Sequence, residues 1–315
     1  MNIVIALLPL YKWQQELCLS KGLVNMDINI FDSITSLLAE SDIKFRTTEI
    51  RKVNLHGENP TIYLSFSENI NLNPTPFSQT PAISCLIVFT LFDAYLENKY
   101  CLAPGISFKQ KYNSLPHVTN QNIIEKECYR LMKTIRNGFV HNINSIISGN
   151  NTLHFNYTSP RGTLFNLVIP FDILNLLYSI ILLLVKGEFG VNTKGHFLNV
   201  ISTYYSELKD YVDRNGNFVD DGDMGIGGSA SSFILMALYS HLHLNTVARY
   251  PVIDSVYEIN EDRILIRSIY DPGFERYSAD YCITYNEKEY IIPKEILDAN
   301  SSLSISDLST WESIC

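Results

Sequence analysis

The most apolar stretch of the chain runs from Phe171 to Val185. A helix of these fifteen residues would be about 22 Å long, whereas the hydrocarbon core of a bilayer is about 30 Å thick. Asp172, Asn175, Tyr178 and Ser179 interrupt the stretch with polar groups. The stretch therefore predicts a helix at the centre of a protein core and no contact with a membrane.

Several other segments in the middle of the chain repeat apolar residues at helical spacing. With the apolar stretch, they predict helices at Ile83–Tyr100, Asn122–Ile147, Phe171–Lys186, Phe197–Asp213 and Ser229–His243. Two alternating segments, Thr152–Tyr157 and Thr163–Ile169, predict a β-hairpin. Four or five helices are enough for a bundle, so residues 76–250 are expected to form a helical bundle with a β-hairpin insertion.

Both flanks of this bundle are expected to contain β-structure. Residues 1–75 predict a mixed α/β region, with a helix at Asp27–Glu40 and strands at Thr48–Leu55 and Thr61–Phe66. Residues 251–315 predict a small β-rich region, with strands at Arg263–Ile269, Tyr281–Tyr285 and Tyr290–Ile292. The expected fold class is mainly α with β-rich additions at both ends, α+β overall.

The charge of the chain limits how it could hold nucleic acid. The 315 residues are 46% hydrophobic and 18% charged, as in soluble globular proteins, and the net charge is −9. An acidic protein has no broad electrostatic attraction for phosphate. RNA would therefore have to be held locally, as a single strand or loop in a small cleft, or with a partner that supplies positive charge.

The six cysteines, at positions 18, 85, 101, 128, 282 and 315, form no Cys-x-x-Cys pair and have no histidine at zinc-ligand spacing. Ile3–Leu10 is apolar, but no basic residue precedes it and no small-x-small cleavage site follows. The sequence therefore predicts a reduced, cytoplasmic protein without a signal peptide.

One hexapeptide, Arg136–His141 (Arg-Asn-Gly-Phe-Val-His), combines side chains suited to phosphate chemistry. Arginine binds phosphate through a planar fork of donors, histidine transfers a proton near neutral pH, and asparagine can fix the imidazole or the phosphate by hydrogen bonding. The motif predicts phosphodiester chemistry without a metal. A second copy of the spacing, Arg51–His56, lies in an alternating segment that predicts a strand, and we interpret it as coincidence.

Helical geometry is expected to separate the two main side chains of this motif. Asn137 and His141 are four residues apart and share a face, whereas Arg136 and His141 are five apart and point about 140° away from each other. Two arrangements would resolve the difficulty. Either the helix ends or bends near Gly138, or the site is completed by a second copy of the chain.

Over Ile135–Asn142 and the helix that leads to it, the sequence resembles the HEPN superfamily of small helical bundles. Ribonucleases of that superfamily carry an Arg and a His a few residues apart, often with Asn after the Arg. The resemblance implies an HEPN-like bundle and a metal-independent endoribonuclease with Arg136, Asn137 and His141 in its site. It also implies a homodimer in which two motifs face each other, and a toxin or antiviral-defence effector.

Two acidic residues of the predicted helix Ile83–Tyr100, Asp93 and Glu97, project from one helical face. In one interpretation, Asp93 or Glu97 orients Arg136 or His141 across the bundle. In the other, both acids belong to a solvated last turn. Asp93 is included among the expected site residues, and Glu97 is interpreted as solvated.

Three functions stay open at this point: an active ribonuclease, an enzyme that is silent until a trigger or partner releases it, and a non-catalytic HEPN-like scaffold or regulatory subunit. The scaffold would bind a protein partner or a nucleotide. No residue set in the sequence predicts a metal or a cofactor. Gly222–Ser229 lacks the lysine of a nucleotide-binding loop, and Asp213–Met224 lacks the glycine and glutamate of a calcium loop.

Overall fold

The structure of the chain is a computed structural model. It describes residues 28–46, 51–56, 59–64, 76–103, 105–158, 162, 164–186, 193–215, 248–253, 255–267 and 277–313. The chain divides into two compact units, each assembled from separate segments. Unit 1 comprises Met1–Arg46, Asn69–Val185 and Tyr204–Leu235, and unit 2 comprises Thr47–Glu68, Lys186–Thr203 and Met236–Cys315.

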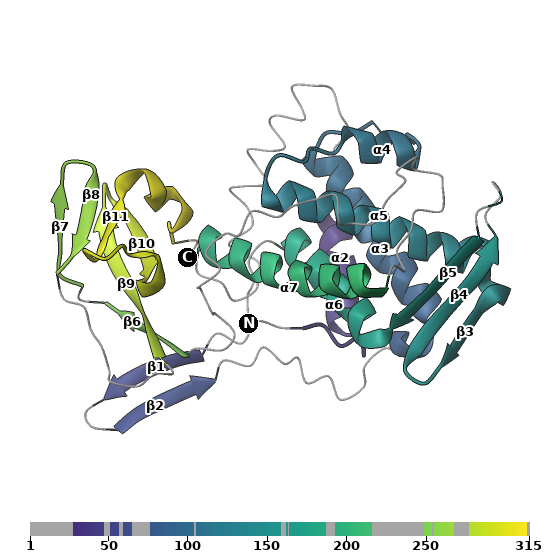
Figure 1. Cartoon of the computed structure of the whole chain (residues 1–315), viewed down its shortest axis with the longest axis horizontal. Helices are drawn as coiled ribbons and strands as arrows, with labels where there is room; N and C mark the ends of the chain where they lie inside the picture. Colours follow the sequence, from purple (N-terminus) through teal and green to yellow (C-terminus); the bar gives the residue numbers. More distant parts are fainter. Residues whose placement is uncertain are drawn as a thin grey trace. The chain divides into compact units, whose positions relative to one another are not determined.

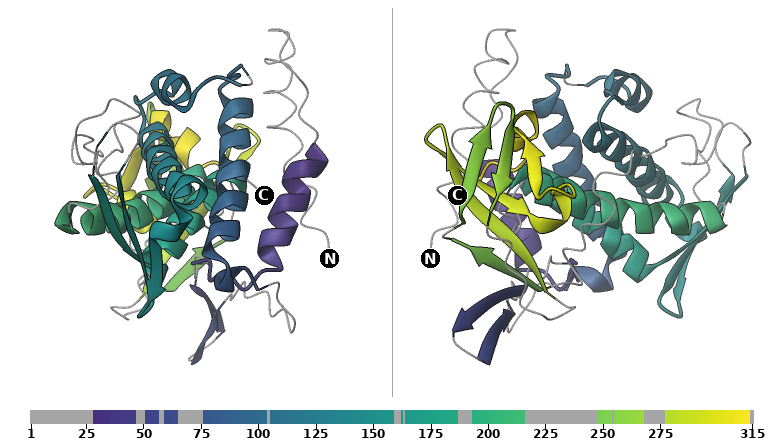
Figure 2. Two further views of the ribbon diagram at one scale, coloured as in Figure 1. Left: turned by 90° about the vertical axis from the view of Figure 1, so that its right-hand side faces the viewer. Right: turned by 60° about the vertical axis from the view of Figure 1, so that its left-hand side comes forward.

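Helices make up most of the described part of unit 1 (Figure 1). They are α2 (Ile28–Ala39), α3 (Pro81–Lys99), α4 (Phe108–Ser114), α5 (Asn120–His141), α6 (Phe171–Lys186) and the second half of α7 (Lys194–Asn215), with a 3-10 turn, η1 (Phe77–Gln79), before α3. Helix α2 runs alongside α3 (Figure 2). The helices predicted around α3, α6 and α7 are confirmed, with ends displaced by up to three residues.

The apolar stretch forms α6, as predicted. Its buried residues are Ile173, Leu174 and the whole of Leu176–Leu184. The polar side chain of Ser179 is accommodated by hydrogen bonds: its hydroxyl donates to the Asn175 carbonyl and accepts from the Arg46 N–H, both at 2.7 Å. Of the helices in the described ranges, none is both long enough and apolar enough to cross a bilayer.

A three-stranded antiparallel sheet packs on the C-terminal part of α5 (Figure 1). Its strands are β3 (Ile146–Gly149), β4 (Thr152–Thr158) and β5 (Leu164–Pro170), in that order. β4 alternates buried and exposed residues, and its Phe155 meets Phe139 of α5 edge-to-face, with ring centroids 5.1 Å apart. The predicted hairpin is therefore confirmed, and β3 is a third strand that the sequence pattern did not predict.

The predicted helix Asn122–Ile147 is wrong at its C-terminal end. α5 ends at His141, because Asn142 leaves helical geometry with φ −137° and ψ 34°. A 3-10 turn, η2 (Ile143–Ser145), follows, and Ile146 then pairs with Phe155 in the sheet. Pairing with β4 thus decides the structure of a segment whose apolar spacing also fits a helix.

Helix α4 was not predicted, because its seven residues are too few to show helical periodicity. It is stabilised at its start by a capping box, in which the Ser107 hydroxyl accepts from the Gln110 N–H and the Gln110 side chain accepts from the Ser107 N–H.

Two β-sheets form most of the described part of unit 2 (Figure 1). The five-stranded sheet has the order β10-β9-β6-β1-β2, with β1 (Arg51–His56), β2 (Asn59–Leu64), β6 (Ala248–Val252), β9 (Tyr277–Tyr285) and β10 (Lys288–Pro293). The three-stranded sheet has the order β11-β8-β7, with β7 (Tyr257–Asn260), β8 (Arg263–Ile266) and β11 (Ser302–Ser304), and two 3-10 turns complete the unit, η4 (Lys294–Ile296) and η5 (Ile305–Thr310). β1–β2 and β9–β10 are antiparallel hairpins, whereas β6 runs parallel to both β1 and β9.

This topology divides the chain differently from the contiguous regions 1–75, 76–250 and 251–315 that the sequence predicts. The hairpin β1–β2 lies in the first region, yet it joins the C-terminal strands because Lys52 pairs with Arg249 of β6. The helix expected at Ser229–His243 falls outside the part of the chain that the structure describes. Helices and sheets together make this an α+β protein, as predicted.

The start of α7 belongs to the core of unit 2, where it packs on Trp311. The indole is fully buried and meets the His196 ring edge-to-face at 5.5 Å. The His196 Nδ1 atom lies 2.7 Å from the hydroxyl of Thr193. The ring of His196 is therefore buried with a hydrogen-bonding partner, as expected for a structural histidine.

Candidate functional site

Helix α5 carries the Arg136–His141 motif. Thr119 caps the start of this helix, and its hydroxyl accepts from the Asn122 N–H at 3.2 Å. Helical hydrogen bonding continues to the end of the motif, where the Asn142 N–H donates to the Gly138 carbonyl at 3.0 Å. The helix therefore continues through Gly138 and ends at His141.

Gly138 instead allows a close approach between α5 and β4. A Cβ atom at this position would lie 2.5 Å from Cδ1 and 2.8 Å from Cε1 of Phe155. Carbon atoms in good contact are about 3.5 to 4.0 Å apart, so no other residue fits without movement. The glycine of the motif thus has a packing role that is independent of any chemistry at its neighbours.

Arg136, Asn137 and His141 lie together at the C-terminal end of α5. The Arg136 Nη1 donates to the Asn137 Oδ1 at 3.1 Å and lies 3.5 Å from the His141 Nε2. Asn137 is buried, Arg136 is half-buried and the His141 ring is exposed. One chain therefore brings the guanidinium and the imidazole into contact, with Asn137 beneath them.

The predicted separation of Arg136 and His141 is wrong because it considered only the directions in which their Cβ atoms leave the helix. The arginine side chain has four rotatable torsions and crosses the helix surface toward the last turn. A second copy of the chain is therefore not needed to bring the two groups together.

Two further residues of unit 1 lie close to Arg136. The Arg136 Cζ is 5.5 Å from the centre of the Phe108 ring, which α4 supplies. The thiol of Cys85 on α3 is fully buried, and this burial raises its pKa to about 12, although the neighbouring Tyr178 hydroxyl and the positive charge of Arg136 partly offset the rise. The guanidinium is therefore held over an aromatic ring, in a partly desolvated setting.

Asp93, the fourth expected site residue, pairs with a lysine of α4 instead. The Lys111 ammonium, which is buried, donates to Asp93 and, at 2.7 Å, to Glu97. Glu97 is therefore ion-paired, and its interpretation as a solvated residue is wrong. Among the contacts of the described residues, none joins Asp93 to Arg136 or His141.

Tyr129 of α5 lies between the acidic pair and the motif. Burial, and then the neighbouring Asp93 carboxylate, raise the pKa of Tyr129 far above its ordinary value, while the charge of Arg136 lowers it. Its ring stacks on Phe89 with centroids 6.0 Å apart. Asp93 is thus a neighbour of a neutral phenol that also lies near Arg136, and it does not contact the motif itself.

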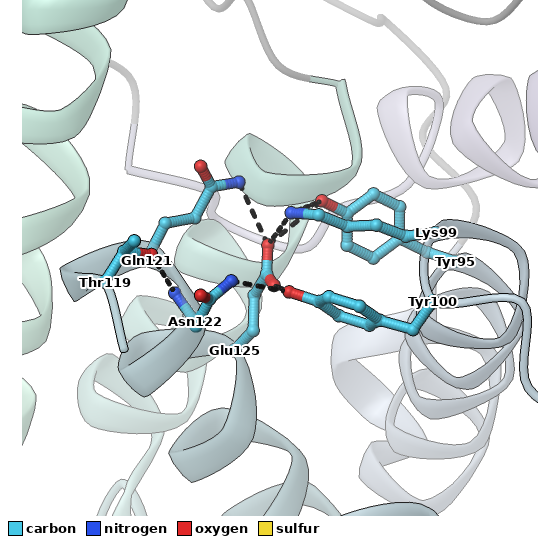
Figure 3. Close-up of polar contacts among 7 residues, drawn as sticks. All are labelled: Tyr95, Lys99, Tyr100, Thr119, Gln121, Asn122 and Glu125. Carbon is cyan, nitrogen blue, oxygen red and sulfur yellow. Dashed lines mark hydrogen bonds and ion pairs between the residues drawn. The ribbon is translucent and has the colours of Figure 1, made fainter. Parts of the chain in front are cut away.

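A second polar cluster, around the buried carboxylate of Glu125, joins α3 to the start of α5 (Figure 3). Its Oε1 accepts from the Lys99 ammonium, from the Tyr95 hydroxyl at 3.1 Å and from the Gln121 amide at 3.0 Å. Its Oε2 accepts from the Tyr100 hydroxyl. All these donors converge on one carboxylate, so the cluster clamps two helices and presents no free reactive group.

Sequence patterns did not predict a role for Phe108, Lys111 or the Glu125 cluster. Phe108 and Lys111 lie on the short helix α4, and the capping box at Ser107 was the one local signal for that helix. Gln121 lies four residues from Glu125, but the other partners, Tyr95, Lys99 and Tyr100, come from a segment at least 25 residues away. Such pairs depend on how α3 and α5 are packed, which periodicity does not specify.

Outside the motif, the cysteines and the side chains that could bind a metal ion form no second site in the described residues. Cys85, Cys128 and Cys282 are free thiols. Cys101 is disulfide-bonded, which differs from the prediction of a reduced protein. Within the described ranges, no three His, Cys, Asp or Glu side chains are grouped so that they could hold a metal ion. The second copy of the motif spacing lies on strand β1, as predicted.

The geometry of the Arg136 group defines what it can do chemically. The guanidinium can donate to phosphate oxygens, and the exposed imidazole beside it can accept or donate a proton. Compared with protein-family models, curated proteins and solved structures, the chain shows no significant match.

Proposed function

We propose that this protein is a metal-independent endoribonuclease of HEPN type, with Arg136, Asn137 and His141 as its site. The observation that carries the proposal is the contact between the Arg136 guanidinium and the His141 imidazole at 3.5 Å, on an exposed helix end. A phosphate-binding group and a proton-transfer group are the two elements that phosphodiester transesterification requires. As for other enzymes of this type, a role as toxin or antiviral-defence effector is part of the proposal.

In the proposed reaction, the ribose 2′-oxygen attacks the adjacent phosphorus while its proton passes to a general base. The bond from phosphorus to the 5′-oxygen breaks, and that oxygen receives a proton from a general acid. The products are a 2′,3′-cyclic phosphate and a 5′-hydroxyl. His141 transfers protons, Arg136 stabilises the charge on the phosphate oxygens, and Asn137 holds Arg136 through its Oδ1.

We further propose that two copies of the chain meet at this site. Two proton transfers occur in the reaction, and a His141 from each copy would supply one base and one acid. The surface next to His141 suits such a contact, since Val140, Ile143 and Ile147 are 41%, 57% and 69% exposed. The substrate would be single-stranded or looped RNA, because the acidic chain offers no broad phosphate-binding surface.

The test is cleavage of single-stranded and hairpin RNA by the purified full chain in excess EDTA, with the ends of the products identified. His141→Ala and Arg136→Ala should each reduce the rate by at least about a hundredfold without a large change in thermal stability. His154→Ala and Arg267→Ala are matched controls, because they remove an exposed histidine of β4 and an exposed arginine of unit 2. If the His141 and Arg136 variants cut as fast as wild type, the proposal is wrong.

The proposed meeting of two copies at the site has its own test. A His141→Ala chain mixed in excess with wild type should suppress the activity of wild-type chains by forming mixed dimers. A wild-type chain that light scattering shows to be monomeric, and that cleaves RNA at full rate, would contradict the dimer.

A non-catalytic scaffold, with or without a regulatory role, is the second candidate. The exposed apolar side chains beside His141 favour it too, because such a surface also suits a protein partner. A chain that cuts no RNA under any condition of the assay, and whose apolar surface is protected from hydrogen exchange by a bound protein, would support the scaffold over the enzyme.

A further inference from the structure

Arg136 is held by a residue that lies far from the motif in the sequence. Phe108 opens helix α4, and its ring centre lies 5.5 Å from the Arg136 Cζ. A cation within about 6 Å of an aromatic ring centre is attracted to it electrostatically. Both side chains are half-buried, so water competes less for the guanidinium than it would on an open surface.

The Phe108 ring is itself fixed by other aromatic rings. It meets Phe89 of α3 edge-to-face with centroids 5.7 Å apart, and Tyr129 of α5 lies tilted at 6.5 Å. Phe89 stacks in turn on Tyr129 at 6.0 Å. The ring that faces Arg136 therefore has little freedom to turn away.

Helix α4 is anchored so that Phe108 stays in this place. One turn after Phe108, the buried Lys111 pairs with Asp93 and Glu97 of α3. The capping box at Ser107 fixes the first turn. A short helix without these anchors would be marginal in water, so its position depends on them.

We propose that Phe108 is a positioning residue, which holds the Arg136 guanidinium toward His141 by a cation–π contact. This inference rests on the proposed function. Without the ring, Arg136 would keep the hydrogen bond to Asn137 and the 3.5 Å contact with the exposed His141 ring, and it would sample other rotamers. Asp93 would then act at a distance, through Lys111 and α4, and not by contact with the motif.

The experiment compares Phe108→Leu, which removes the ring, with Phe108→Tyr, which keeps it. Phe108→Leu should slow RNA cleavage by about five- to thirtyfold, mainly in kcat, and Phe108→Tyr should restore most of the rate. Tyr95→Leu is the matched control, because it removes an aromatic ring that carries a different cation, Lys99, at 5.4 Å. It should leave the rate near that of wild type.

A second readout does not depend on cleavage. In NMR spectra, the Arg136 side-chain protons should be shifted by the ring current of Phe108, with Arg136→Lys identifying the signals. The shift should vanish in Phe108→Leu and persist in Phe108→Tyr and Tyr95→Leu. Loss of the shift in Phe108→Leu, with retained thermal stability, separates positioning from unfolding.

The outcomes are distinguishable. An unshifted Arg136 signal in wild type, or a Phe108→Leu variant that cleaves as fast as wild type, overturns the inference. A wild-type chain that cuts no RNA but shows the shifted Arg136 signal refutes the proposed ribonuclease activity. The same result still supports the contact by which Phe108 positions Arg136.

Discussion

Replacing Gly138 with alanine would test the close packing of α5 on β4. The added Cβ would lie 2.5 Å from Cδ1 of Phe155, about 1 Å inside a good carbon–carbon contact. Phe155 is fully buried and packs on Phe139, so its ring has no free space to enter. Overpacking of this kind costs about 1 to 3 kcal/mol.

Alanine also has an advantage, since it is favoured over glycine within a helix by about 0.5 to 1 kcal/mol. The net expectation is therefore a loss of up to about 2.5 kcal/mol in the free energy of unfolding. Urea unfolding of the full chain, followed by far-UV circular dichroism, measures it, because α5 and the other helices of unit 1 dominate that signal. Gly149→Ala is the control, since a Cβ there meets nothing within 4 Å, and its effect should be within about 0.5 kcal/mol.

A double variant decides whether Phe155 is the cause. In a Phe155→Leu background the ring is gone, so Gly138→Ala should cost less than in wild type, by a coupling of about 0.5 to 3 kcal/mol. An equal cost in both backgrounds, or a Gly138→Ala chain more stable than wild type, would refute the packing argument. It would also leave the glycine of the motif without a structural explanation.

Three further outcomes are expected. RNA cleavage should persist in excess EDTA, because the proposed chemistry uses an arginine and an imidazole only; a strict requirement for added magnesium would contradict this. Burial raises the pKa of the Cys85 thiol from 9.0 to about 12. The unfolded chain therefore loses this proton at lower pH than the folded chain, and between pH 9 and 12 stability falls by up to about 1.4 kcal/mol per pH unit from this group. Urea unfolding at pH 8, 9 and 10 should show a shallower decline for Cys85→Ala than for wild type, and parallel declines would exclude the effect. Lys111→Met should lower the free energy of unfolding by about 2 to 3 kcal/mol, because it leaves Asp93 and Glu97 without their shared cation. Lys109→Met changes an exposed residue of the same helix and should be nearly neutral in the same urea experiment.

Elements that are decided by their own sequence were predicted well. The apolar stretch became α6 with its predicted ends, and the alternating segments around β4 and β5 became a hairpin. Elements that depend on partners were not. Ile146 and Ile147 continue the apolar spacing of α5, and only pairing with β4 turns them into strand β3.

The candidate site was predictable in part. The sequence indicated Arg136, Asn137 and His141, and the structure brings these three together, although their function is a proposal. The sequence could not indicate that polar residues of α5 would be buried. Glu127 and Arg130, for example, lie outside the apolar stripe of the helix, yet both are buried because they form an ion pair with each other, at 2.9 Å between Nε and Oε1.

The parallel pairing of β1 with β6 has a consequence for biosynthesis. Lys52 leaves the ribosome about 200 residues before its neighbour Arg249. At about 5 to 20 residues per second, translation of the intervening chain takes about 10 to 40 s. During that interval the hairpin β1–β2 has one strand edge without its final neighbour, while the segment Asn69–Val185 of unit 1 is being synthesised. The five-stranded sheet therefore closes late in synthesis, and the nascent hairpin is the segment for which a chaperone that binds exposed strand edges would matter most.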